Sequence, residues 1–456
     1  MRPFALPLVG LLWLAACGEP APPPPNVVVV VIDTLRADDL PPYGGDPANA
    51  PFLAQLAAEG LVFENAWAAS SWTAPATASI FTSRYPNEHG VVQGLLAKQP
   101  KGEGKAELRR IPSELETLPE FMKSQGYSTF AVTDNINIDE PLGFADGFDR
   151  FRYLEGFAES GARRLNEQLL EWKDEIRGSE PFFLYLHYMD PHEPYERHDE
   201  WMPEGAPPVP EDRMTDRAAY RSEIRNVDEN LRAIFDELQL GPETVVLVTA
   251  DHGQEFLDHG RTGHKWTLFS ELIHVPLIVR IGAEGPRGRL EANVGNMDLL
   301  PTLRHVLDAP PSEQDRGLSL LSVTAEEGRG LREMFAMRTD AYGPRVRELR
   351  SVVVGHYKLI VNEDNGQRKL FDLEADPGET KNLVGERPEV VRSLQTKLNG
   401  QRDRAALELM TESSDRRLNA AEIEQLKTLG YTGDDEEEDE ESAPVELEDR
   451  DKGGNE

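Results

Sequence analysis

The sequence is poor in several features that would place it in a common class of protein. Its 456 residues include one cysteine, which excludes a disulfide framework and a cysteine-rich zinc site. Lysine and arginine number 48 against 82 aspartates and glutamates, and the resulting net charge of -34 disfavours nucleic acid as a partner. Beyond the N-terminus no apolar run reaches the ~18 residues of a membrane span, which excludes a multi-span membrane protein.

The N-terminal segment has the pattern of a targeting signal. Arg2 precedes an apolar stretch from Phe4 to Ala16, and small residues lead up to Cys17. This pattern resembles the lipobox of bacterial lipoproteins, whose cysteine is diacylated; an ordinary secretory signal with an incidental cysteine is the alternative. We expect a signal peptide over 1–16, lipidation at Cys17 and a lipid-anchored, proline-rich linker over 17–25. The mature protein would then be an exported lipoprotein anchored to the bacterial cell envelope.

The body of the chain alternates predicted strands with predicted helices. Residues 26–32 (NVVVVVI) and 244–249 (TVVLVT) are continuous β-branched runs, as in strands buried on both faces of a parallel sheet. A helical pattern over 216–238 separates such strands. This order predicts an α/β fold with a doubly wound, mostly parallel sheet.

The pattern changes from about Leu349, where short strands and one helix predict a small α+β subdomain. Residues 434–456 are dominated by acids and cannot bury enough apolar surface to fold. We therefore expect a catalytic α/β domain over 26–335, a C-terminal α+β subdomain over 336–433 and a disordered acidic tail over 434–456.

Two aspartates follow the predicted buried strands. Asp33 comes directly after residues 26–32, and Asp251 comes just after residues 244–249. Ligands of open α/β sheets collect at the carboxyl ends of strands, so the two carboxylates can share one cation. His252 adds an imidazole, and this donor set suits Ca²⁺, Mn²⁺, Mg²⁺ or Zn²⁺. Taken alone, an aspartate in such a place is often only a helix N-cap.

A hydroxyl and an imidazole complete the candidate chemistry. Pro75 suits the first turn of a helix, which places Thr73 at or just before the helix N-terminus. A hydroxyl there, beside a divalent ion, can act as a nucleophile; an ordinary threonine cap is the alternative. His192 lies between two prolines in a rigid loop and could bind substrate oxygens or protonate a leaving group. His187, within the preceding strand, is interpreted as a core residue.

In their order and spacing these motifs resemble the sulfatase family of the alkaline phosphatase superfamily, and the similarity runs from Asn26 to about Gly433. The resemblance implies an alkaline-phosphatase-like fold for the mostly parallel sheet. It rests on the following segments: residues 26–33, Thr73–Arg84 (TAPATASIFTSR) with Tyr85 and Pro86, Pro191–Tyr195 (PHEPY), Asp251–Gly253 (DHG), Lys265, and Leu370–Leu383 (LFDLEADPGETKNL).

The resemblance also implies roles for individual residues. Asp33, Asp251 and His252 match family metal ligands, and Thr73 matches the nucleophile position. His192 and Lys265 match residues that hold substrate oxygens and assist the leaving group. Weaker candidates for substrate binding are His264, Asn135 and Asn137, and for the two asparagines a role in a turn is the alternative. One divalent metal is implied, which is Ca²⁺ in the family.

The sequence departs from the family at the nucleophile and at the metal. Arylsulfatases carry a C/S-x-P-x-R pattern whose cysteine or serine is oxidised to formylglycine. Here Thr73 takes that place, and its β-methyl group prevents the same oxidation from giving an aldehyde; Thr77 replaces the arginine. The aspartate pair at the first strand reads Asp33-Thr34, which removes one negative ligand and favours Mn²⁺ or Zn²⁺ over Ca²⁺.

We therefore expect a metal-dependent hydrolase of sulfate or phosphate esters in which Thr73 attacks in line and forms a covalent enzyme ester. Its partner would be an anionic sulfate or phosphate ester. Two alternatives remain: a phospho-group transferase of the same superfamily, and a surface binding lipoprotein that has lost its catalytic activity.

Overall fold

The computed structural model describes most of the chain. The predicted signal peptide, Cys17, Lys265 and the predicted acidic tail lie outside the described residues. The described residues are 23–95, 108–156, 161–202, 205–264, 266–323, 332–340, 347–414, 419–429 and 431. Among them, no helix combines the length and the apolar character needed to cross a membrane.

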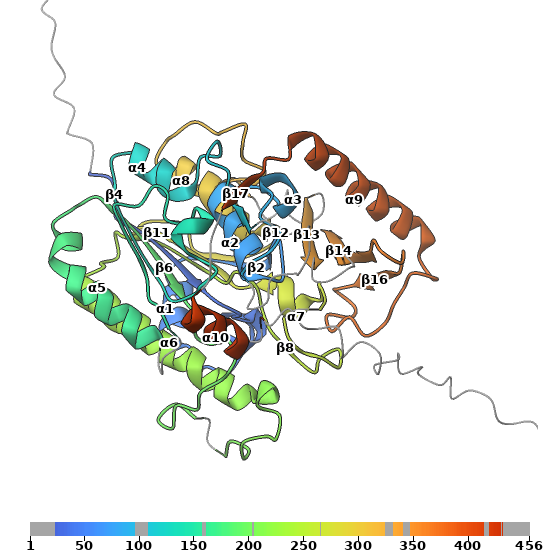
Figure 1. The fold of residues 1–456 in the computed structure, drawn as a ribbon, viewed down its shortest axis with the longest axis horizontal. Helices are drawn as coiled ribbons and strands as arrows, with labels where there is room; N and C mark the ends of the chain where they lie inside the picture. Colours follow the sequence, from blue (N-terminus) through green and yellow to red (C-terminus); the bar gives the residue numbers. More distant parts are fainter. Residues whose placement is uncertain are drawn as a thin grey trace, which may run out of the picture.

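A sheet of nine strands lies at the centre of the molecule (Figure 1). Its strands are β1 (Val27–Ile32), β2 (Leu61–Trp67), β4 (Ser128–Thr133), β5 (Arg150–Tyr153), β6 (Phe182–Tyr188), β7 (Val245–Thr249), β10 (His274–Val275), β11 (Leu277–Ile281) and β12 (Gly288–Gly295). They are ordered β10-β2-β11-β7-β1-β6-β4-β5, and β12 also pairs with β2. The run from β7 to β5 is parallel, whereas β11 is antiparallel to both β7 and β2. The predicted α/β class with a mostly parallel sheet is confirmed.

Helices cover both faces of this sheet. Figure 1 shows α5 beside α6 on one side, and α2, α4 and α8 on the other. The helices are α1 (Pro51–Ala58), α2 (Thr73–Thr82), α3 (Pro86–His89), α4 (Leu118–Ser124), α5 (Gly161–Arg177), α6 (Arg217–Leu238), α7 (Ser270–Ile273), α8 (Leu299–Val306), α9 (Pro388–Glu408) and α10 (Ala420–Thr428). Because both faces are covered, every residue of β1 is buried, which explains its uninterrupted β-branched sequence.

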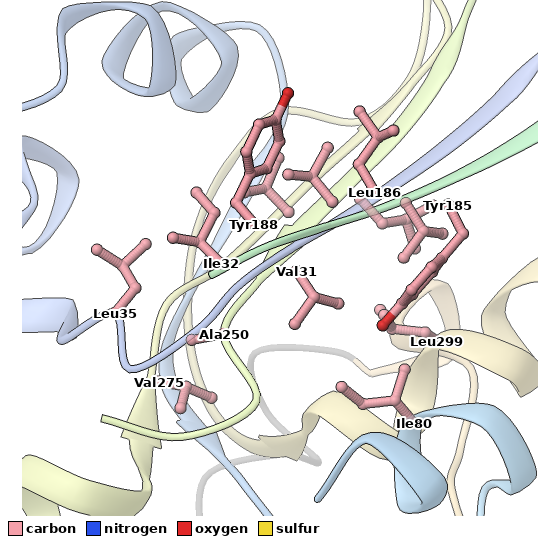
Figure 2. Packing of buried hydrophobic residues seen from close by; sticks show 14 of the residues in the cluster. Val31, Ile32, Leu35, Ile80, Tyr185, Leu186, Tyr188, Ala250, Val275 and Leu299 are labelled. Carbon is pink, nitrogen blue, oxygen red and sulfur yellow. The ribbon is translucent and has the colours of Figure 1, made fainter. Parts of the chain in front are cut away.

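The alternation of side chains along β1 determines the face of the sheet toward which Asp33 points. Figure 2 shows Val31 on the same side of the strand as Ile80 of α2, while Ile32 lies near Tyr188. Since successive side chains of a strand point to opposite faces, the next residue, Asp33, returns to the α2 side. Its carboxylate indeed lies beside Thr73, the first residue of α2.

A smaller antiparallel sheet forms most of the C-terminal part. It consists of β13 (Glu333–Asp340), β14 (Arg347–Val354), β15 (Tyr357–Asn362) and β16 (Arg368–Asp372), in that order, and α9 packs against it. Two short antiparallel strand pairs complete the strands: β3 (Leu108–Arg110) with β17 (Glu412–Ser414), and β8 (Glu255–Phe256) with β9 (Thr262–Gly263). The antiparallel C-terminal subdomain expected from the sequence is therefore present.

The last described residues return to the large sheet. Leu426, Leu429 and Tyr431 belong to the same hydrophobic cluster as β1. At the other end, β13 begins at Glu333, slightly before the expected boundary at 336. The segment 336–433 thus contributes to both parts of the molecule.

A buried ion pair connects the small sheet to the loop that carries β8 and β9. Lys358 Nζ lies 3.0 Å from Glu379 Oε1, and neither side chain has exposed surface. Glu379 also accepts a hydrogen bond of 2.5 Å from the backbone N–H of Ser270, at the start of α7. The pair therefore holds the C-terminal sheet against the segment that follows Asp251 and His252.

We expect Lys358→Met to lower the free energy of unfolding by about 3–5 kcal/mol, because it leaves the Glu379 carboxylate buried without a cation. The double variant Lys358→Met/Glu379→Leu should recover much of this loss. Urea denaturation measures both, with the exposed Lys381→Met as a matched control. A single variant as stable as Lys381→Met would show that the pair does not hold the two parts together.

Candidate active site

The two aspartates expected to share a cation lie at the ends of neighbouring parallel strands. Asp33 follows β1 and Asp251 follows β7, and both side chains are fully buried. Asp251 Oδ1 accepts hydrogen bonds from the backbone N–H groups of Thr34, at 3.3 Å, and His252, at 2.8 Å. These bonds fix the carboxylate and turn its other oxygen, Oδ2, toward the space between the strand ends.

Two buried carboxylate oxygens in this space, Asp33 Oδ1 and Asp251 Oδ2, have no hydrogen-bond partner among the described residues. One potential ligand atom from each of Asp33, His187 and Asp251 lies within 4.8 Å of the others. A buried carboxylate without a partner is strongly unfavourable, so this pair needs a proton or a cation. Carboxylate oxygens with an imidazole nitrogen fit a divalent ion.

His252 presents an unprotonated nitrogen to the same space. Its Nδ1 lies 3.0 Å from the carbonyl oxygen of Gly253, which places the proton on Nδ1. Its Nε2 then faces Asp251 Oδ2 at 3.4 Å and Asp33 Oδ1 at 3.8 Å. Burial lowers the pKa of His252 to about 4, so the ring is neutral at pH 7. A side chain at Gly253 would clash with the Glu271 carbonyl, so glycine permits this close turn.

The two aspartates oppose each other's ionisation. Burial, and next the charge of Asp33, raise the pKa of Asp251 to about 7. Burial also acts against the charge on Asp33, but a hydrogen bond from His187 and the nearby imidazoles of His192 and His252 outweigh it and lower that pKa. Without a cation, the pair therefore holds a proton near neutral pH that exposed carboxylates would have lost.

Thr73 begins α2, as the sequence predicts, and Trp72 is the N-cap residue in extended conformation. Thr73 Oγ1 lies 3.2 Å from His252 Nε2 and 3.5 Å from Asp33 Oδ2. Asn135 supports the same carboxylate by donating its Nδ2 to Asp33 Oδ2. A hydroxyl at a helix N-terminus, next to two buried carboxylates, is thus in contact with the candidate metal ligands.

Two further histidines lie beside this hydroxyl. The rings of His192 and His264 meet edge to face with centroids 4.9 Å apart, and both side chains are buried. Nδ1 of His192 is 2.6 Å from the Glu193 carbonyl oxygen, so its proton lies there. The Nε2 atoms of both histidines instead face the hydroxyl of Tyr431, at 2.9 Å from His192 and 3.2 Å from His264.

The structure thus brings most of the residues singled out from the sequence to one place. Asn137 is different, since its Oδ1 accepts a hydrogen bond from the backbone N–H of Leu95 and so supports a loop. Lys265 lies outside the described residues. The residues brought together are Asp33, Thr73, Asn135, His192, Asp251, His252 and His264.

Sequence reasoning missed four residues of the site. His187, interpreted as a core residue, is fully buried, but its Nε2 lies 3.6 Å from Asp33 Oδ2. It pairs with Val31 in the neighbouring strand, and this position near the end of β1 could have identified it as a site residue. Asn296 follows β12 and donates to the Ala250 carbonyl. Tyr431 and Arg338, whose guanidinium lies 5.0 Å over the Trp72 ring, give no local signal in the sequence.

The fold and the site together define the class of protein. A mostly parallel sheet with a C-terminal antiparallel sheet, and a hydroxyl facing acidic strand ends, is the arrangement of the alkaline-phosphatase-like hydrolases. The family model described as Sulfatase matches residues 25–309, more than half of the chain, and the chain belongs to the sulfatase family. A second model, N-sulphoglucosamine sulphohydrolase, C-terminal, matches residues 258–404. The chain is therefore an enzyme of the sulfuric ester hydrolase type.

Individual relatives agree with this assignment. The uncharacterised sulfatase YidJ of Escherichia coli is 24% identical over 423 residues, which cover 77% of this chain and 81% of YidJ. The structure of a 2-O GAG sulfatase matches with a TM-score of 0.67 at 18% identity, covering 86% of this chain and 95% of that one. The phosphonate monoester hydrolase of Agrobacterium radiobacter matches with a TM-score of 0.66 at 19% identity, covering 86% and 100%. The structural similarities establish a shared fold.

In metal-free protein, the raised pKa of Asp251 should make stability depend on pH. Between the ordinary pKa of 3.8 and the folded value of about 7, the folded state binds a proton that the unfolded state has released. This group's contribution to stability is therefore lost as pH rises through that window. We expect Asp251→Asn to remove this part of the slope, measured by urea unfolding in chelator at several pH values.

The exposed carboxylate of Asp403 provides the control, since Asp403→Asn should leave the slope unchanged. Addition of Mn²⁺ should flatten the wild-type slope, because a bound cation favours the ionised carboxylates. Identical slopes for wild type and Asp251→Asn would contradict the coupling between the two aspartates.

Proposed function

We propose that the chain is a metal-dependent hydrolase of sulfate esters in which Thr73 is the nucleophile. The observation that carries this proposal is the position of Thr73 Oγ1, buried at the start of α2 and within 3.5 Å of both His252 Nε2 and Asp33 Oδ2. Next to it lie carboxylate oxygens that have no hydrogen-bond partner among the described residues. A side chain that only capped the helix would not need these neighbours.

The metal would be held by Asp33, Asp251 and His252, with His187 as a further donor beside the two carboxylates. When bound, a divalent ion lowers the pKa of a nearby hydroxyl and neutralises charge on ester oxygens. The family resemblance favours Ca²⁺, while the imidazole donors and the loss of an acid at Thr34 favour Mn²⁺ or Zn²⁺.

In the first step, the Thr73 hydroxyl gives up its proton to Oδ2 of Asp33, 3.5 Å away, because Nε2 of His252 is the nitrogen that would hold the metal. The oxygen attacks sulfur in line, so that a bond from sulfur to Thr73 forms while the bond from sulfur to the leaving alcohol oxygen breaks. The free N–H groups at the start of α2 stabilise the charge that builds up on the sulfuryl oxygens.

The leaving oxygen takes a proton from His192, assisted by Lys265. Burial lowers the pKa of His264 to about 3, so this ring is neutral and acts as a hydrogen-bond partner instead of an acid. A water molecule then attacks sulfur and gives one proton to Nε2 of His192, which lost its proton to the leaving alcohol. The bond from sulfur to Thr73 breaks, the Thr73 oxygen takes back the proton held by Asp33, and sulfate is released.

Phosphorus esters are the second candidate substrates. Their support is the structural similarity to a phosphonate monoester hydrolase over 86% of this chain. An unoxidised hydroxyl nucleophile serves attack at phosphorus as well as at sulfur. The transferase has no comparable support, because the relatives described above are sulfatases and a hydrolase. The inactive binding lipoprotein has none either, because Asp33, Asp251, His192, His252 and His264 remain buried together.

Two further parts of the proposal concern the substrate and the location of the protein. Similarity to a 2-O GAG sulfatase supports a sulfated sugar as substrate, and an anionic ester suits a site of this kind. Lipidation at Cys17, after export, would anchor the enzyme to the bacterial cell envelope, on its periplasmic or outer-surface side.

We expect Thr73→Ala to lower kcat/KM for 4-nitrophenyl sulfate by at least ~1000-fold, because it removes the attacking oxygen. Thr73→Ser keeps the hydroxyl and should retain activity within about tenfold of wild type. Mass spectrometry of acid-quenched reactions should find a sulfuryl or phosphoryl ester on the peptide that contains Thr73.

Thr82→Ala is the matched control, since Thr82 lies at the far end of the same helix and its hydroxyl donates a 2.7 Å hydrogen bond to the Ala78 carbonyl. It should behave like wild type. Equal activity of Thr73→Ala and Thr82→Ala, or an ester on another residue, would exclude Thr73 as the nucleophile.

A further inference from the structure

The reactive groups of the site are closed off from solvent. Asp33, Thr73, Asp251, His252 and His264 have no exposed surface, and His192 is 2% exposed. Attack requires the ester sulfur to come within about 3–3.5 Å of Thr73 Oγ1. A side chain that now covers the hydroxyl must therefore leave before the substrate can react.

Tyr431 is that side chain. Its hydroxyl lies 2.9 Å from His192 Nε2 and 3.2 Å from His264 Nε2, and its side chain is hydrogen-bonded to Thr73. The phenol oxygen thus lies between the two histidine nitrogens and the Thr73 hydroxyl. It occupies the space next to Thr73 that the sulfuryl group of the substrate must enter, because the leaving oxygen of an in-line attack lies on the far side of sulfur.

The ring of Tyr431 occupies a defined pocket. It stacks on Trp72 with centroids 5.8 Å apart and an angle of 28°. The imidazoles of His192 and His264 adjoin it at centroid distances of 5.8 and 6.0 Å. Arg338 holds Trp72 in place through its guanidinium and donates a 3.2 Å hydrogen bond to the His264 carbonyl. An aromatic face next to hydrogen-bonding nitrogens is a binding surface for a six-membered ring with a hydroxyl group.

We propose that the pocket formed by Trp72, His192 and His264 receives the ring of the substrate alcohol, and that Tyr431 fills this pocket in the free protein, with its hydroxyl in the place of the sulfuryl group. This inference rests on the proposed hydrolase function. The substrate it implies is the ester of a ring alcohol, whether a phenol or a sugar, whose ring packs on Trp72.

Packing of α10 holds Tyr431 in the pocket. Leu426 and Leu429 are fully buried, and the backbone N–H of Tyr431 donates a 2.7 Å hydrogen bond to the Leu426 carbonyl. Gln425 Oε1 accepts a 3.1 Å hydrogen bond from the hydroxyl of Tyr153 on β5. Substrate binding must compete with these contacts, so the fraction of enzyme with an open pocket reduces the apparent affinity.

Replacement of Tyr431 tests the proposal directly. Tyr431→Ala empties the pocket and should raise kcat/KM for 4-nitrophenyl sulfate at least tenfold, mainly through a lower KM. Free phenol should bind this variant and inhibit it competitively, while wild type binds phenol at least tenfold more weakly. Tyr431→Phe keeps the buried ring, and so the fold, but loses the hydroxyl contacts, and should raise kcat/KM less than Tyr431→Ala.

Two further variants distinguish weaker packing of α10 and Tyr431 from a general loss of structure. Tyr153→Phe removes the hydrogen bond to Gln425 and should raise kcat/KM modestly. Tyr127→Phe loses a hydrogen bond to the Pro25 carbonyl, remote from the pocket, and should change nothing. Parallel assays with a sulfated pyranose, such as glucosamine 6-sulfate, show which class of ring alcohol gains more from the open pocket.

Two results would overturn the proposal, and a third would separate it from the proposed hydrolase function. A fall in kcat for Tyr431→Phe with unchanged KM would make Tyr431 a catalytic group and overturn the proposal. Failure of phenol to bind folded Tyr431→Ala, measured by calorimetry, would also overturn it. Phenol binding does not depend on Thr73 chemistry, so a variant that binds phenol but cleaves no ester contradicts the hydrolase and leaves the subsite standing.

Discussion

The site depends on the burial of two carboxylates beside each other. Asp33 and Asp251 end adjacent parallel strands, have no exposed surface, and each keeps one oxygen without a hydrogen-bond partner among the described residues. Such a pair is stable only when a proton or a cation balances its charge. The unprotonated nitrogen of His252 and the hydroxyl of Thr73 lie beside the same carboxylates, so the proposed cation and the proposed nucleophile would lie next to each other.

The fold satisfies this constraint through strand order. The central position of β1, between β6 and β7, brings His187 and Asp251 to either side of Asp33. The cross-over helix α2 starts at the same edge and offers its N-terminus. The C-terminal part contacts the region of the site in two places. The Lys358–Glu379 ion pair packs against the segment that follows His252, and Tyr431, which follows α10, fills the pocket next to His192.

The sequence revealed those parts of the site that have a local pattern. A β-branched run followed by an acid identifies β1 with Asp33 and β7 with Asp251, and Pro75 identifies the start of α2. His187 escaped notice because a histidine in a strand has the same local signature whether it packs in the core or faces a ligand. Tyr431 and Arg338 reach the site only through tertiary packing, from elements whose own sequence pattern concerns their helix or strand. The domain boundaries, Cys17 and Lys265 stay predictions.

The most direct test of this account is a crystal structure of the protein grown with Mn²⁺, with anomalous diffraction recorded at the manganese edge. The account predicts an anomalous peak at coordination distance, about 2.0–2.6 Å, from carboxylate oxygens of Asp33 and Asp251, with Thr73 Oγ1 next to it. A peak elsewhere, such as at the Glu255, His259 and Glu271 group, with the space between Asp33 and Asp251 filled only by water, would contradict it.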